Sequence, residues 1–133
     1  MKKTILATLL LTLCFAFADN VDAAYRDMGF YHIPNNSWEI NSVTKTKTTY
    51  SVPKVKAIEV STSLTDPCSS CKLGVRMYQG SDWFALGSTL KLNEEKSFIG
   101  HDGSASPGTF QLGATRVDFT LLETKAKIRW TYD

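Results

Sequence analysis

Apolar and polar residues alternate along most of the chain after residue 24. A period of two predicts β-strands that bury one face and expose the other. The last such segment is the clearest, because Ala126, Ile128 and Trp130 alternate with Lys127 and Arg129. The apolar spacing of an amphipathic helix, at i, i+3, i+4 and i+7, does not occur together with helix caps. The pattern therefore predicts a chain built from strands.

Runs rich in Thr, Val, Tyr, Phe and Trp end at clusters of Gly, Pro, Asn, Asp and Ser, which is typical of strands separated by turns. Segments 73–79 and 83–86 predict a hairpin around Gly80-Ser81-Asp82. Strict alternation along 55–64 places Val55 and Glu59 on one face of a strand and Val60 on the other. The expected strands are 25–33, 38–52, 55–64, 73–79, 83–86, 89–92, 96–99, 109–112, 117–121 and 126–132.

Short strands spaced by about 8–12 residues predict an all-β fold, and in particular an antiparallel β-sandwich. Alternating faces favour this over a parallel sheet, whose strands are covered on both sides. The polar turn at 102–108 leads directly into a strand that carries Phe110 and Leu112. Such a tight corner resembles the corner of immunoglobulin domains, and it favours Greek-key connections of an immunoglobulin-like or jelly-roll-like type.

The first 23 residues have the pattern of a secretory signal peptide. Lys2 and Lys3 precede an apolar run from Ile5 to Ala18, which is shorter than the ~20 residues of a membrane-spanning helix. Small residues allow cleavage after Ala18 or after Ala23, and we favour Ala23 because the mature chain then starts at the first strand. A retained N-terminal anchor is the alternative. We expect a single β-sandwich domain at 24–133 that is secreted or periplasmic, and the short signal is typical of bacteria.

The charge of the chain indicates no polyanionic partner. The sequence has 15 Lys and Arg and 13 Asp and Glu, a net charge of +2. Removing residues 1–23 leaves this balance unchanged, because they contain two residues of each sign. We therefore expect no nucleic acid and no anionic membrane surface as a partner. We also expect no membrane span, because no other apolar stretch reaches spanning length.

Two cysteines, Cys68 and Cys71, remain after signal removal, in the motif Pro67-Cys68-Ser69-Ser70-Cys71. In an oxidising compartment such a pair predicts a structural disulfide. A C-x-x-C redox centre is the alternative, but it needs a helix after the first cysteine, and the residues from Leu73 onward alternate like a strand. A zinc site would have to add both His32 and His101, which stand far apart in the sequence. We expect no metal and no other cofactor.

A hydrolytic site is not indicated either. Segment 100–104 contains His101, Asp102 and Ser104 within a Gly-rich turn. A catalytic triad is defined by its geometry in space, and the sequence has no G-x-S-x-G motif to expose a nucleophile. We interpret this segment as a solvated turn and expect no catalytic residues.

Aromatic and basic residues are the remaining candidates for ligand contact. Trp83 and Tyr78 lie on the predicted hairpin, where an exposed aromatic ring would stack on a sugar or anchor a protein. Lys45 and Lys47 lie on a Thr-rich strand and indicate a basic binding face, or else protect an exposed sheet edge from pairing with another chain.

These observations favour a small, secreted, non-enzymatic binding module for a protein or a carbohydrate, with a structural disulfide. Two alternatives stay open. One is an extracellular antagonist, either a hydrolase inhibitor or a bacteriocin-like toxin. The other is a thiol–disulfide redox protein that uses Cys68 and Cys71.

Overall fold

Strands make up all the regular secondary structure of the part of the chain that the computed structural model describes, which is residues 24–80, 82–86, 89–100, 106–118 and 122–133. Only the backbone is described for the two strands β5 and β7. The strands are β1 (Tyr25–Ile33), β2 (Glu39–Lys47), β3 (Lys54–Thr62), β4 (Leu73–Gln79), β5 (Asp82–Leu86), β6 (Glu95–Ser97), β7 (Ile99–Gly100), β8 (Gly108–Arg116) and β9 (Thr124–Thr131).

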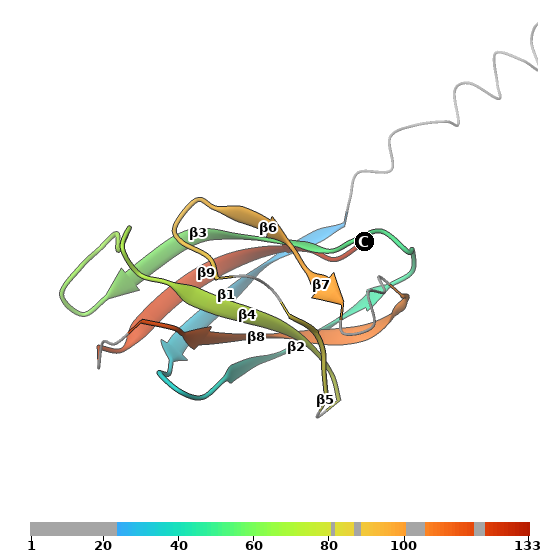
Figure 1. Cartoon of the computed structure of the whole chain (residues 1–133), viewed down its shortest axis with the longest axis horizontal. Helices are drawn as coiled ribbons and strands as arrows, with labels where there is room; N and C mark the ends of the chain where they lie inside the picture. Colours follow the sequence, from blue (N-terminus) through green and yellow to red (C-terminus); the bar gives the residue numbers. More distant parts are fainter. Residues whose placement is uncertain (1–23, 81, 87–88, 101–105, 119–121) are drawn as a thin grey trace, which may run out of the picture.

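These strands form two sheets that pack face to face (Figure 1). One sheet, sheet A, has four strands in the order β1-β9-β3-β6, and the other, sheet B, has five in the order β2-β8-β4-β5-β7. Every pair of neighbouring strands is antiparallel. The prediction of an all-β, two-sheet antiparallel architecture is confirmed.

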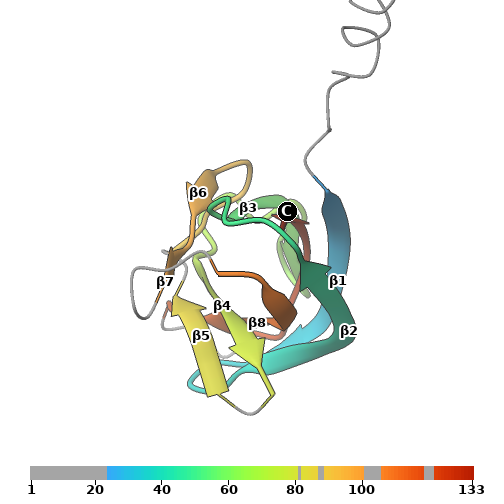
Figure 2. The ribbon, with the colours of Figure 1, turned by 90° about the vertical axis from the view of Figure 1, so that its right-hand side faces the viewer.

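The chain passes from one sheet to the other at both open sides of the sandwich, as the end-on view in Figure 2 shows. On one side the edge strands β1 and β2 belong to different sheets, and the Asn41 amide donates a hydrogen bond to the Gly29 carbonyl at 2.9 Å. On the other side, buried Phe98 is the single residue between β6 and β7. Its amide donates to the carbonyl of Pro53 at 2.9 Å. The edges of the two sheets are therefore tied to each other.

Most predicted strands overlap observed ones, and 25–33 and 73–79 agree at both ends. The predicted strand 38–52 is too long, since β2 ends at Lys47, and 109–112 is too short, since β8 continues to Arg116. The predicted strand 89–92 is wrong, since only isolated bridges form there, at Leu90 and Leu92. Residues 119–121 of the predicted strand 117–121 lie outside the described part of the chain. Its start is wrong, because β8 ends at Arg116 and Val117 is exposed.

Strand β9 supplies the centre of the core between the sheets. Its inward residues Ala126, Ile128 and Trp130 are buried, and Trp130 is the largest of the fully buried side chains. Side chains from both sheets surround them: Met28, Phe30, Ile33, Val55, Ala57, Val60, Leu73, Val75, Met77, Phe110, Leu112 and Ala114. Burial of these side chains is the main source of stability in such a fold.

A β-bulge in β3 changes which of its residues face the core, so the predicted faces of that strand are wrong beyond the bulge. The pairing with β9 runs from Ala57 opposite Ile128 to Glu59 opposite Lys127, which leaves Ile58 as an extra residue. One extra residue reverses the alternation that follows it. Val60 is therefore buried in the same core as Val55, whereas unbroken alternation placed them on opposite faces.

Replacing the central tryptophan tests this description of the core. We expect Trp130→Ala to lower the free energy of unfolding by about 3–5 kcal/mol, because it removes a fully buried indole. Thr131→Ala, on the opposite face of the same strand, should have a much smaller effect. Chemical denaturation followed by circular dichroism measures both, and equal losses would contradict the assignment of faces.

Candidate functional site

The two lysines predicted to contact a ligand lie on β2, an edge strand of sheet B. Lys45 is half-buried, with its Nζ 6.0 Å from the centre of the Tyr132 ring. Lys47 is only 1% exposed, and its Nζ donates to the backbone carbonyl of Thr49. Burial lowers the pKa of the Lys47 ammonium, and the nearby carboxylate of Asp133 opposes that shift. Lys47 is thus wrongly predicted as a surface residue, because the loop after β2 folds over its side chain.

Tyr78 also differs from the prediction, since it is only 6% exposed. Its ring packs against the edge of Trp38, with the ring centres 6.3 Å apart, and the guanidinium of Arg76 lies 4.1 Å from the centre of the Trp38 ring. Gly113 on β8 makes this burial possible, because a Cβ there would lie 2.5 Å from a Tyr78 ring carbon. Tyr78 therefore packs flat on the outer surface of sheet B and offers little area to a ligand.

Trp83 lies opposite Tyr78 in the β4–β5 hairpin, whose presence the sequence predicts. Its side chain lies outside the described part of the chain, and so do His101, Asp102 and Ser104 of the predicted turn.

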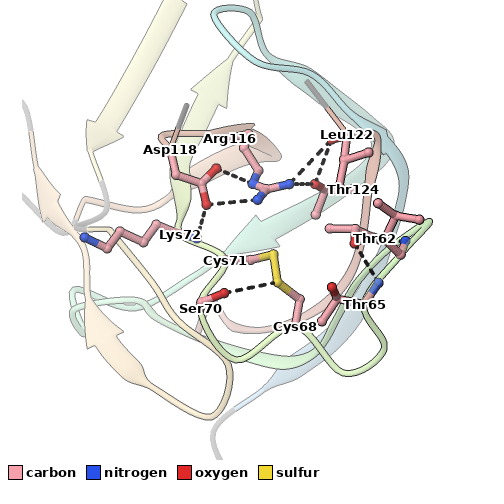
Figure 3. The surroundings of a disulfide bond; sticks show 11 residues. Thr62, Thr65, Cys68, Ser70, Cys71, Lys72, Arg116, Asp118, Leu122 and Thr124 are labelled. Carbon is pink, nitrogen blue, oxygen red and sulfur yellow. Dashed lines mark hydrogen bonds and ion pairs between the residues drawn. A yellow bond between two sulfur atoms is a disulfide. The ribbon is translucent and has the colours of Figure 1, made fainter. Parts of the chain in front are cut away.

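Cys68 and Cys71 form a disulfide, which confirms the predicted pairing (Figure 3). Both residues are buried, at 4% and 0% exposure, and the amide of Cys68 donates to the Val60 carbonyl at 2.7 Å. The chain after Cys71 enters strand β4 and not a helix, so no helix dipole acts on either sulfur. Burial and the missing helix weigh against a redox centre.

Beside the disulfide, a buried arginine organises the end of the sandwich (Figure 3). Arg116 is 6% exposed and is paired with Asp118, one of its bonds being 2.9 Å long. The same guanidinium donates to the hydroxyl of buried Thr124, and the Asp118 carboxylate accepts from the amide of Lys72 at 3.3 Å. Because its charge is paired and hydrogen-bonded, this buried cation has a structural role.

No cluster of three metal-ligating side chains occurs among the residues that the structure describes. His32 is exposed and bonds to exposed Glu123, and such surface pairs contribute little to stability. The cysteines are held in their disulfide.

The outer face of sheet A carries an open groove that the sequence did not reveal. Its volume is about 270 Å³, and its lining comprises Gly29, Phe30, Tyr31, Glu59, Ser61, Lys125, Ala126 and Lys127. Tyr31 is 65% exposed and stands at the β1 bulge, where the register with β9 shifts. The sequence pattern did not distinguish Tyr31 from the other tyrosines.

The Tyr31 ring lies across the backbone of Gly29. A Cβ on Gly29 would lie 3.2 Å from the tyrosine oxygen and 3.4 Å from each of two adjacent ring carbons. The contact with Gly29 is thus made by the hydroxyl end of the tyrosine ring. The rest of the Tyr31 side chain is largely exposed to solvent.

Two cross-strand ion pairs lie on this face. Asp27 accepts two hydrogen bonds from Arg129, at 2.8 and 3.1 Å, and this pair lowers the pKa of the Asp27 carboxyl. Lys127 lies 3.2 Å from Glu59, its register partner on β3. The β3 partner of Lys125 is the neutral Ser61, so the groove lining has one more cation than anions.

At the other end of β9, four hydrogen bonds hold the Asp133 carboxylate. The amides of Thr48 and Thr49 donate at 3.1 and 2.8 Å, and both hydroxyls donate as well. These bonds, that of the Thr48 hydroxyl foremost, lower the pKa of Asp133 far below its ordinary value. The contact fixes the loop after β2 against the last residues of the chain.

The chain matches no protein-family model, no curated protein and no solved structure. Within the described residues, no helix is long and apolar enough to cross a membrane.

The disulfide closes a very short loop, so its loss should be tolerated. We expect the double variant Cys68→Ser, Cys71→Ser to fold and to lose about 1–2 kcal/mol of unfolding free energy, because a short loop removes little entropy from the unfolded chain. Denaturation of both proteins measures the difference. Failure of the double variant to fold would contradict a purely local role.

Stability should fall in acid partly because of Asp133. Its pKa is lower in the folded than in the unfolded state, so its contribution is present above the unfolded value of about 4 and is lost as the pH falls below it. We expect Asp133→Asn to lower the melting temperature at pH 7, with the difference from wild type shrinking between about pH 4 and pH 2. Asp66→Asn, at an exposed turn, is the control. A difference that is constant with pH would contradict this assignment.

Proposed function

We propose that residues 24–133 form an exported, non-enzymatic binding module, and that its ligand occupies the groove beside Tyr31. Residues 1–23 act in this proposal as a cleaved signal peptide, so the module is secreted or periplasmic. The predicted Greek-key wiring is part of the same proposal. It is supported by β9 lying between β1 and β3, and by β8 lying between β2 and β4.

The observation that carries the proposal is the position of the Tyr31 ring. An exposed aromatic side chain usually loses conformational freedom when it binds a ligand, and that loss weakens binding. Here the ring already rests on Gly29, within 3.2–3.4 Å of where a Cβ would be. The exposed ring thus lies close to the sheet beside polar side chains, an arrangement typical of binding sites.

The charged groups of the groove support binding more than catalysis. Glu59 and Lys127 are paired with each other across β3 and β9, and their side chains are 69% and 44% exposed. General acid–base catalysis normally uses carboxyls or amines that are partly desolvated in an enclosed site. A solvated pair serves better to hydrogen-bond a ligand and orient it.

Substitution of the tyrosine tests the proposal. We expect Tyr31→Ala to weaken binding at least tenfold for whichever ligand the wild type selects from arrays of purified glycans and peptides, because the aromatic platform is lost. Tyr50→Ala is the matched control, since Tyr50 is exposed by 77% but lies outside the groove. Both variants should keep the wild-type melting temperature, because both side chains are exposed. Equal affinities of wild type and Tyr31→Ala for every selected ligand would refute the proposed site.

A further inference from the structure

We propose that the ligand of the Tyr31 groove is an acidic saccharide, whose ring packs on Tyr31 and whose carboxylate or sulfate binds Lys125. This inference rests on the proposed binding function and names the class of ligand.

The aromatic platform favours a sugar ring. A pyranose has one face of C–H groups, which packs on an aromatic surface, and a rim of hydroxyls that require hydrogen-bond partners. Tyr31 offers an exposed ring, and Glu59 and Ser61 line the same groove with acceptors and a donor. A purely apolar ligand would leave these polar groups without partners, which costs binding energy.

The balance of charge favours an acidic sugar over a neutral one. Lys127 is neutralised by Glu59, and Arg129, further along β9, by Asp27. Lys125 faces Ser61 across the sheet and adds one positive charge to the groove lining. Each of the two neighbouring cations of β9 is paired with an anion. An anionic group on the ligand would pair with Lys125 in the same way.

A nucleic acid has both stackable rings and anionic groups, but the observations favour it less. Binding along a phosphate backbone draws on several cations in a continuous stripe. On this face each of the two neighbouring cations of β9 is already paired with an acid. Of the two lysines that line the groove, Lys125 is the one whose cross-strand partner is neutral, and it suits one anionic group on a short ligand.

Calorimetry with the mature chain and trisaccharides tests the inference. The probes are trigalacturonate, its neutral methyl ester, a sulfated trisaccharide and a single-stranded trinucleotide. We expect an acidic trisaccharide to bind at least tenfold more tightly than the neutral ester, and Lys125→Met to remove that preference. The carboxylated and sulfated probes distinguish the two possible anionic groups.

Two variants separate a specific contact from a general effect. Lys54→Met removes the same charge from the same outer face but outside the groove, and should leave affinity within about twofold. Gly29→Val keeps the tyrosine but pushes its ring off the sheet, because the space above Gly29 is filled by that ring. It should weaken all saccharide binding at least tenfold.

The outcomes distinguish this inference from the function on which it rests. Equal binding of neutral and acidic trisaccharides that still depends on Tyr31 would overturn the acidic class and leave the binding groove in place. Tighter binding of the trinucleotide, or no binding of any acidic trisaccharide, would overturn it as well. Loss of Tyr31 dependence for every ligand would instead overturn the proposed function.

Discussion

The alternation of β9 is the constraint on which the architecture of sheet A depends. This strand pairs with β1 on one side and β3 on the other, and its buried residues run without interruption through Ala126, Ile128 and Trp130. Both neighbours fit this strict period by inserting a bulge, β1 after Phe30 and β3 after Ala57. The core stays continuous because the bulges in β1 and β3 shift the register of these strands against β9, whereas β9 itself keeps an unbroken alternation.

The same adjustment produces the groove. The β1 bulge lies where the chain carries Tyr31, and Gly29 leaves room on the sheet for the tyrosine ring. The β3 bulge brings Glu59 opposite Lys127, which neutralises that lysine, and Ser61 opposite Lys125, which does not neutralise it. The need to keep the core continuous thereby determines which side chains face each other on the outer surface of sheet A.

The outer face of sheet B has a different character although it is also rich in aromatic residues. There Tyr78 fills the space above Gly113 and contacts the edge of Trp38, which in turn lies under the Arg76 guanidinium. The rings cover one another, so Tyr78 is buried without belonging to the core between the sheets. On both sheets a tyrosine thus lies over a glycine. On sheet B a second aromatic ring lies alongside and Tyr78 is buried, whereas on sheet A Tyr31 stays exposed.

Most of the strands, the two faces of β9 and the disulfide could be predicted from the sequence alone, since each follows from residues that are near one another in the chain. Alternation defines a face locally, and the short spacing of Cys68 and Cys71 allows a disulfide within a turn. The packing of distant segments, in contrast, buries Tyr78 and Lys47 and leaves Tyr31 exposed, and the register of β3 brings Val60 into the same core as Val55. Exposure depends on what distant segments place above a side chain, and a bulge depends on the register with a partner strand. Neither property is encoded in the local alternation of apolar and polar residues.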